Sequence, residues 1–199
     1  MIKISSVILS CRTKLGDTDI KKQRYSDMEI IDAINDTVSV MSEDLLCFSK
    51  TWVIDCKECV ARYELPHDFL KPIHLHLNNK LITNIKSIES EKKGSGASFD
   101  LQTVHFFGTN IKDNDRIEIY YNYIETISNK EESIHLPLNA KEIIVSYALH
   151  LLYQNPIRKD GTGRSTHYYN LYEKKIIALR NRVKMNSQSV NITTKFKKV

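Results

Sequence analysis

The sequence predicts an α+β fold, with a helical bundle formed by both chain ends and an antiparallel β-rich lobe inserted between them. Near both ends, apolar residues recur every three or four positions, which is the period of an amphipathic helix. The middle instead contains short runs rich in Val, Ile, Thr, Tyr and Phe, separated by polar turns, as is typical of strands. We therefore divide the chain into residues 1–48 (first half of the bundle), 49–135 (β-rich lobe), 136–185 (second half of the bundle) and 186–199 (extended basic C-terminal arm).

Two helices are expected before the β-rich lobe. The first is predicted from the apolar face Ile4, Ile8, Cys11 and Leu15. It should end before Gly16. The second should begin with a capping box, in which the Ser26 hydroxyl and the Glu29 carboxylate satisfy backbone N–H groups. Its apolar stripe is Ile31, Ile34, Val38, Met41 and Leu45.

The strands of the middle region are delimited by turn residues. We expect them over residues 51–55, 60–64, 73–77, 81–85, 101–107 and 116–124. Asn78 and Asn79 suit a hairpin turn, because asparagine tolerates left-handed backbone angles. Residues 91–98 offer little apolar surface to bury and are expected to form a loop.

The helical period returns after Pro137. One helix is predicted from Ala140, Ile144, Tyr147 and Leu151. It should end at Asn155, because Pro156 disfavours the α conformation in the residue before it. Gly161 and Gly163 are expected in the loop that follows. The last helix carries the stripe Tyr168, Tyr172, Ile176, Leu179 and Val183. From residue 186 the helical period is lost, and we expect an extended arm.

The composition is that of an ordinary soluble chain. Its 199 residues, 41% of them hydrophobic and 27% charged, suffice for one good core or two small lobes. No apolar run approaches the roughly 18 residues of a membrane span, so we expect no contact with a membrane. Arg12 and Lys14 stand where a signal peptide would have its small-residue cleavage site, so we expect no signal peptide. The four cysteines are expected to be reduced thiols.

Charge is distributed unevenly along the chain. Residues 158–199 hold eleven basic against two acidic side chains, a net charge of +9, within a total of +5. The preceding 157 residues therefore sum to −4. The basic limb suits an acidic partner, either DNA phosphate or an acidic protein rim. A solvated helix face and a frayed tail would account for it equally well.

The chain contains no strong signature of catalysis or metal binding. Cys56 and Cys59 form a CxxC pair that could hold half a zinc site, with nitrogens from His74 and His76. A single CxxC lacks the second pair of a strong zinc signature, so we expect no metal there. Residues 161–166 lack the GK[ST] end of a phosphate loop. We therefore nominate no catalytic, cofactor-binding or metal-binding residue, and we expect neither a cofactor nor enzymatic activity.

Several short sequence motifs, the family phrases, nevertheless resemble in their order and spacing those of one protein family. The phrases are Arg24-Tyr25-Ser26-Asp27 with Ile34-Asn35, residues 63–69 (Tyr-Glu-Leu-Pro-His-Asp-Phe), Leu136-Pro137 and residues 146–149 (Ser-Tyr-Ala-Leu). They resemble the head-to-tail adaptor, or connector ring, proteins of tailed bacteriophages, including the tail tubular A proteins. The resemblance covers roughly residues 4–183. It implies a bundle made from both chain ends, a β-rich insertion, and assembly as a ring, typically a dodecamer, under the portal.

The resemblance implies a structural virion protein that joins the portal to the tail and forms part of the DNA conduit. The implied partners are further copies of the chain, the portal protein, a tail tube or nozzle protein, and double-stranded DNA in transient passage. The implied location is the neck of the virion, after assembly in the host cytoplasm. The alternative is a sequence-nonspecific nucleic-acid-binding protein that uses the basic C-terminal helix and tail.

Overall fold

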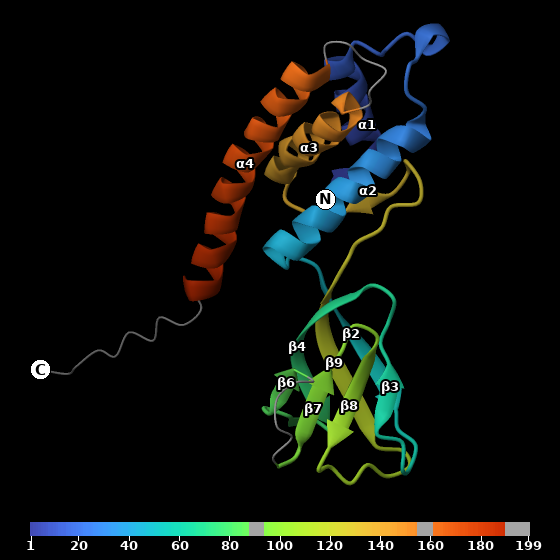
Figure 1. Cartoon of the computed structure of the whole chain (residues 1–199), viewed down its shortest axis with the longest axis vertical. Helices are drawn as coiled ribbons and strands as arrows, with labels where there is room; N and C mark the ends of the chain where they lie inside the picture. Colours follow the sequence, from blue (N-terminus) through green and yellow to red (C-terminus); the bar gives the residue numbers. More distant parts are fainter. Residues whose placement is uncertain (88–93, 155–160, 190–199) are drawn as a thin grey trace, which may run out of the picture. The chain divides into compact units, whose positions relative to one another are not determined.

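A computed structural model describes residues 1–87, 94–154 and 161–189, and these fall into two compact units. Residues 1–45 and 126–189 form the first, which we call the helical unit (Figure 1). Leu46–Glu125 form the second, which we call the β unit. Both ends of the chain thus build the helical unit, and the β unit is inserted between them. The predicted α+β class is confirmed.

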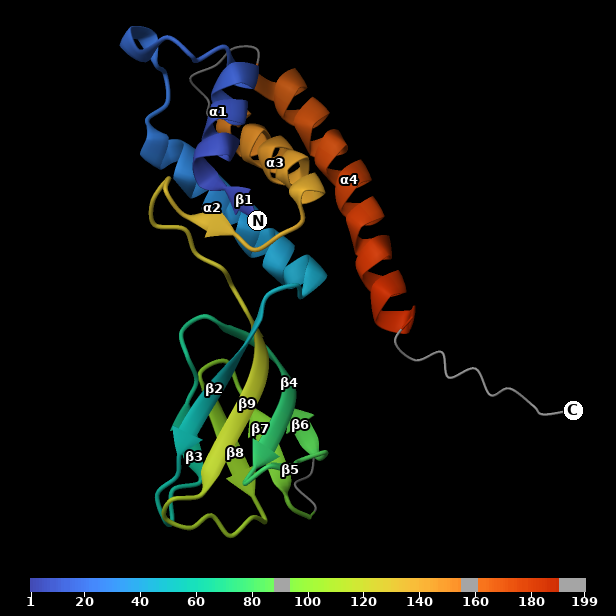
Figure 2. The same cartoon turned by 180° about the vertical axis from the view of Figure 1, so that it is seen from behind.

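Four helices dominate the helical unit. They are α1 (Ile4–Leu15), α2 (Asp27–Leu45), α3 (Lys141–Tyr153) and α4 (Gly161–Ser189), with short 3-10 turns η1 (Ile20–Lys22) and η2 (Leu138–Ala140). Helix α3 lies at the centre of the unit and contacts α1, α2 and α4 (Figures 1 and 2). Its buried residues include Ile143, Ile144, Val145, Ala148, Leu149 and Leu152. A helix that is apolar on most of its faces is stable only when other elements surround it, which explains the central position of α3.

The predicted helix boundaries at α1 and α2 are confirmed. Gly16 closes α1 in the left-handed conformation, with φ +63°. At the start of α2, the Glu29 carboxylate accepts a hydrogen bond from the Ser26 N–H (2.7 Å), and the Ser26 hydroxyl accepts one from the Glu29 N–H (3.2 Å). This is the expected capping box.

A buried ion-pair network ties the loop after α1 to the start of α2. The Arg12 guanidinium, 6% exposed, contacts the carboxylates of Asp17 (3.1 Å) and Asp27 (2.5 Å). Arg12 also donates to the Tyr25 carbonyl oxygen (3.1 Å). The Asp17 side chain is only 1% exposed, and it accepts a further hydrogen bond from the Arg24 N–H (2.8 Å). Every charge of this network is therefore paired, as burial requires.

Residues 126–135 belong to the helical unit, although their sequence predicted them to be part of the β-rich lobe. Strand β10 (Ser133–Ile134) pairs antiparallel with β1 (Ile2–Lys3). The Asn35 side chain on α2 brackets Ile127, donating to its carbonyl oxygen (2.9 Å) and accepting from its N–H (2.8 Å). Because β10 pairs with a strand at the other end of the sequence, no local pattern could predict that residues 126–135 belong to the helical unit.

The β unit contains two four-stranded sheets. The first has the order β2-β9-β4-β5, from Ser49–Asp55, Arg116–Tyr123, Phe69–Leu77 and Lys80–Leu81. The second has the order β3-β8-β7-β6, from Arg62–Glu64, Thr103–Phe107, Gly96–Phe99 and Ile85–Ser87. The pairings are antiparallel except for the parallel β6–β7 pair.

One core joins the two sheets of the β unit. Strand β9 pairs with both β2 and β4, and it buries Ile117, Ile119 and Tyr121 at alternate positions. The second sheet adds Val104 and Phe106, both from β8. The predicted hairpin turn at Asn78-Asn79 is confirmed, because both residues have positive φ (49° and 64°) between β4 and β5.

Part of the predicted loop 91–98 is a strand. Residues 96–98 lie in β7, paired with β8, and Ala97 and Ser98 are buried. Gly96 is required there, because an added Cβ would lie 2.3 Å from the Asn84 carbonyl oxygen. Gly96 offers no side chain to bury, which favoured a loop, but this same lack of a side chain permits the close approach to Asn84. Residues 91–93 of the predicted loop lie outside the described residues.

Helix α4 is longer than predicted at both ends. Gly161 and Gly163, expected in a loop, lie in its first turn, and the helix continues to Ser189, so residues 186–189 are not extended. From residue 164 to 189 the sequence has no glycine or proline to end a helix. The rest of the predicted arm, 190–199, and the expected helix end at Asn155 lie outside the described residues. Among the residues described, no helix is long and apolar enough to cross a membrane.

Candidate assembly surfaces

Two of the family phrases, the motifs on which the family resemblance is based, contain residues that connect different elements of the fold. In the first, the Tyr25 hydroxyl donates to the Leu152 carbonyl oxygen (2.7 Å), Ser26 caps α2, and Asp27 pairs with Arg12. In the second, the Asp68 carboxylate accepts a hydrogen bond from the Tyr121 hydroxyl (3.2 Å) and pairs with the Lys50 ammonium. These residues therefore hold elements together, and none of them forms part of a catalytic arrangement.

Helix α4 presents two exposed edges beside the stripe that it buries. The buried stripe contains Ser165, Tyr172, Ile176 and Leu179. Consecutive residues are about 100° apart around a helix. One edge of α4 therefore carries Tyr169, Glu173, Ile177 and Arg180, and we call it the pocket edge. The opposite edge carries Leu171, Lys174, Ala178 and Arg182, and we call it the basic edge.

A cavity of about 250 Å³ opens on the pocket edge, between α2, α3 and α4. We call it the tyrosine pocket. Its lining includes Asp44, Tyr147, Tyr169, Tyr172, Glu173 and Arg180. The Tyr147 and Tyr172 rings are in contact, with centroids 4.5 Å apart. Arg180 pairs with Asp44 at 3.0 Å. The lining thus combines aromatic rings with two carboxylates and one cation.

Two polar groups of the tyrosine pocket have hydrogen-bonding capacity that the described residues do not fill, the Tyr172 hydroxyl and the Glu173 carboxylate. Tyr172 is 4% exposed, and its hydroxyl makes no hydrogen bond to any residue that the structure describes. Burial, and then the Asp44 charge, raise the pKa of Tyr172. Glu173 makes no ion pair with a described residue; its charge and its hydrogen bond to the Tyr169 hydroxyl raise the pKa of Tyr169. The pocket therefore has unused capacity to accept hydrogen bonds.

Internal ion pairs neutralise part of the positive charge on α4. Arg180 pairs with Asp44, and Lys175 lies 3.4 Å from the Glu142 carboxylate. Lys14 pairs with the same carboxylate at 2.8 Å and, as the larger cause, lowers the pKa of Glu142. Lys174 and Arg182 on the basic edge are exposed and make no ion pair with a described residue. The free positive charge of the described part of α4 is thus concentrated on one edge.

A serine–histidine pair, which no sequence motif indicated, joins α3 to α4. The Ser165 hydroxyl lies 2.9 Å from Nδ1 of His150, and Nε2 of His150 lies 3.0 Å from the Gln154 amide nitrogen. A nucleophile and base at this distance could act in catalysis if a carboxylate oriented the base. Here Ser165 is buried and the third group is an amide, so the geometry indicates a link between helices.

The CxxC pair does not assemble a metal site with the two histidines. Cys56 is 4% exposed and burial raises the pKa of its thiol, whereas Cys59 is exposed with a positive φ of 62°. The His74 ring stacks on Tyr120, with centroids 6.3 Å apart. Among the described residues, no group of three or more His, Cys, Asp or Glu side chains is placed to hold a metal ion.

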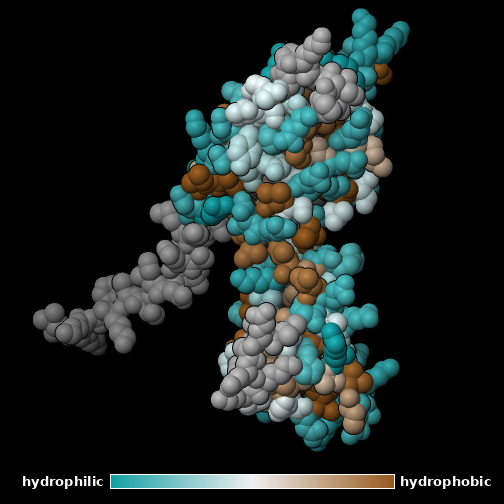
Figure 3. Space-filling view, in the orientation of Figure 1, coloured by the Kyte–Doolittle hydropathy of each residue, from teal (hydrophilic) through white to brown (hydrophobic). Residues whose placement is uncertain are grey.

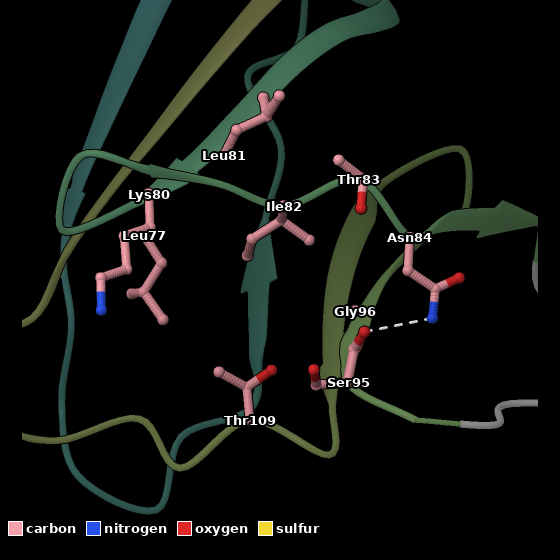
Figure 4. A pocket seen from close by; sticks show the side chains of 9 residues that line it. All are labelled: Leu77, Lys80, Leu81, Ile82, Thr83, Asn84, Ser95, Gly96 and Thr109. Carbon is pink, nitrogen blue, oxygen red and sulfur yellow. Dashed lines mark hydrogen bonds between the residues drawn. The ribbon is translucent and has the colours of Figure 1, made fainter.

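The β unit has a second cavity, of about 260 Å³, beside the turn after β5 (Figure 4). Leu77, Leu81 and Ile82 provide apolar side chains, and Thr83, Ser95 and Thr109 provide hydroxyl groups. The Asn84 amide closes one side by donating to the Ser95 carbonyl oxygen (3.1 Å). The cavity has the size of a recess for one side chain, and its lining does not select a ligand class.

Hydrophobic residues reach the surface of both units, as the brown areas of Figure 3 show. The most exposed large ones are Leu101 (97%), Ile20 (84%), Leu138 (73%) and Met1 (67%), followed by Met28 and Leu9. Phe106 and Phe107 are buried in the β unit and do not contribute to this surface. The apolar surface available for assembly therefore comes mainly from turns and helix faces.

Comparison with known protein families shows that the chain is a structural head-to-tail adaptor. The model of the SU10 adaptor protein family matches residues 2–193, and the chain belongs to this family. The match confirms the resemblance seen in the sequence.

One solved structure with some similarity to this chain is described as "Neck of empty GTA particle computed with C6 symmetry". Its chain is 12% identical, with 82% of this chain and 90% of that chain covered and a TM-score of 0.30. Among curated proteins, none matches.

Proposed function

We propose that the chain forms a closed ring of twelve copies that joins the portal to the tail of a tailed phage or phage-like particle, with a portal protein and a tail tube or nozzle protein as its partners. The observation that carries this proposal is the family match over residues 2–193. The role is structural, without enzymatic activity. Assembly takes place in the host cytoplasm, and the mature ring lies in the virion neck.

The charge pattern of α4 supports a conduit that DNA passes through without being held. Each phosphate neutralised by a protein cation adds to a salt-dependent grip, which would slow passage. Arg180 and Lys175 are already occupied by Asp44 and Glu142. The described surface of α4 therefore offers few free cations to a passing duplex.

The proposal is tested by negative-stain electron microscopy of the purified chain, alone and mixed with the portal protein of the same particle. Closed rings, or rings seated on the portal, are the expected result. A chain that stays monomeric at high concentration and leaves the portal unchanged would contradict the proposal.

A sequence-nonspecific nucleic-acid-binding protein is the second candidate, favoured by exposed Lys174 and Arg182 on one edge of α4. It predicts tight binding to duplex DNA that weakens steeply with salt. The ring proposal predicts weak binding, so a salt titration of DNA affinity separates the two.

We also propose that the basic C-terminal segment docks on a neighbouring subunit or on the next protein of the neck. Residues 190–199 lie outside the described residues; they contain Val, Ile, Thr and Phe, which favour strands, and Lys195, Lys197 and Lys198. Deleting 190–199 should leave helicity and melting nearly intact and weaken incorporation into particles. Normal incorporation combined with lost DNA affinity would favour the second candidate.

A further inference from the structure

The tyrosine pocket has the chemistry of a site for a cationic side chain. Its exposed Glu173 carboxylate has no cation among the described residues, and the side chains of Tyr147 and Tyr169 lie beside it in the lining. Tyrosine rings attract an ammonium or guanidinium group through their negatively charged faces, and carboxylates attract it directly. A long cationic side chain supplies the donors, the positive charge and the apolar stem that this lining accommodates.

Charges on the same helix identify the source of that side chain. Lys174 on the basic edge is exposed and unpaired with any described residue. Around a helix it points about 100° away from Glu173 and about 120–160° away from Tyr169, Tyr172 and Arg180, all of which line the pocket. One subunit therefore carries a cation on one side of α4 and a cation-accepting pocket on the other. Such complementary but different surfaces make head-to-tail contacts.

The geometry of a closed ring matches this arrangement. In a ring of twelve, the directions from one subunit to its two neighbours differ by about 150°, close to the angle between Lys174 and the pocket. Glu173 and Lys174 are consecutive, so they lie only about 1.5 Å apart along the helix axis. When α4 runs along the ring axis, symmetry therefore brings Lys174 of one copy level with the pocket of the next.

We propose that Lys174 of one copy enters the tyrosine pocket of its neighbour, beside Glu173, and that this contact is repeated around the ring. The inference rests on the proposed ring function and names one of its contacts. Ile177, 53% exposed, and Tyr169, 37% exposed, would form an apolar border on the pocket side. Ala178, which follows Lys174 by one turn, is small enough to allow close approach on the other side.

A charge swap tests the contact. Glu173→Lys and Lys174→Glu should each lower the yield of rings, or of adaptor bound to portal, by roughly tenfold, because each places like charges face to face. The double variant E173K/K174E has the same composition and net charge as the natural chain. It should restore assembly to within about threefold, because the opposite charges meet again. Glu131→Lys, at an exposed position of the loop before β10, is the matched control and should assemble normally.

The outcomes separate this inference from the proposed function. Single reversals that assemble like the natural chain, or a double variant no better than the single ones, would overturn the Lys174 contact while leaving the ring in place. A natural chain that forms no ring and does not bind the portal would overturn both.

Discussion

The interactions that stabilise the helical unit internally differ from those that stabilise the β unit. In the helical unit, apolar helix faces surround α3, and the Arg12 network buries paired charges beside them. In the β unit, strands pair over long sequence separations, and unusual backbone angles set their turns. Among the described residues, those other than glycine with positive φ are Leu46, Cys59, Asn78, Asn79 and Asn114, and all lie in the β unit.

This difference affects which part of the molecule tolerates change. In the helical unit, loss of one exposed ion pair should change the free energy of unfolding little, because solvent screens such a pair. Loss of one partner of a buried ion pair should cost much more, because the other charge stays buried without a partner. A strand pairing depends on register, which turns and core side chains set together. The family phrases contribute one partner to such contacts in each unit, Asp27 to the ion pair with Arg12 and Asp68 to the hydrogen bond from Tyr121.

The largest expected effect is on the helical unit. Arg12→Ala leaves Asp17, whose side chain is 1% exposed, buried near a lost partner, and it should lower the free energy of unfolding by about 3–5 kcal/mol. Lys14→Ala removes a half-exposed ion pair with Glu142 and should cost less than about 1 kcal/mol. Urea unfolding followed by helical circular dichroism measures both. Equal effects of the two substitutions would show that the buried network does not stabilise this unit.

A core truncation in the β unit tests whether the two units unfold separately. Leu75 is fully buried in the core between the sheets, so Leu75→Ala should cost about 2–5 kcal/mol. The loss should appear in the unfolding of the β unit, followed by Trp52 fluorescence, and leave the helical transition in place. If both transitions shift together, the units form one cooperative structure.

Acid should weaken the β unit through Asp100. The hydrogen bond from the Thr103 hydroxyl, followed by the Gln102 N–H, lowers the pKa of Asp100 from 3.8 to about 2. Because the folded pKa lies below the unfolded value, the stabilisation is present above the unfolded pKa and is lost as pH falls toward about 2. Asp100→Asn should therefore lower stability at neutral pH and flatten the pH dependence of β-unit unfolding in that window. An unchanged slope would contradict this assignment.

The helical unit should respond to acid through a different partner. The hydrogen bond from Arg12 is the largest cause that lowers the pKa of Asp27. The sign is the same as for Asp100, so this stabilisation is also lost as pH falls below the ordinary aspartate range. In Arg12→Ala the acid sensitivity of helical unfolding should be smaller, whereas that of the β unit should be unaltered. Equal changes in both units would contradict a local origin.

The smallest expected effect comes from the CxxC turn. Cys59 has a φ of +62°, a conformation that costs about 1 kcal/mol for residues other than glycine. Cys59→Gly should therefore raise the stability of the β unit by a few tenths of a kcal/mol up to about 1 kcal/mol, and Cys59→Ser should be neutral. A large loss of stability in Cys59→Ser, together with stoichiometric zinc in the natural chain, would show that the pair binds metal.

The same contrast explains what the sequence could predict. Helices α1 and α2 carry local start and stop signals, Ser26 with Glu29 and then Gly16, and the structure confirms both. The β1–β10 pair joins the two chain segments of the helical unit, so no local pattern predicts it. Strand β7 pairs with the nearby β8, but its residues Gly96, Ala97 and Ser98 do not show the apolar alternation that predicts a strand. The turn at Asn78-Asn79 is predictable because its residue type reports its backbone angle.

The candidate assembly surface is only partly visible in the sequence. The basic limb is a property of composition, and counting charges reveals it. The tyrosine pocket requires Asp44 on α2, Tyr147 on α3 and Glu173 on α4 to converge, which only the packing of three helices decides. The pairing of Arg180 with Asp44 likewise determines which cations remain free.

Counting the copies in one assembly tests the central claim most directly. Native mass spectrometry of the natural chain, bound to its portal protein, gives the number of adaptor subunits without reference to their shape. The ring proposal predicts a single closed species with twelve copies of this chain. A distribution of monomers and small open oligomers on an otherwise intact portal would contradict it.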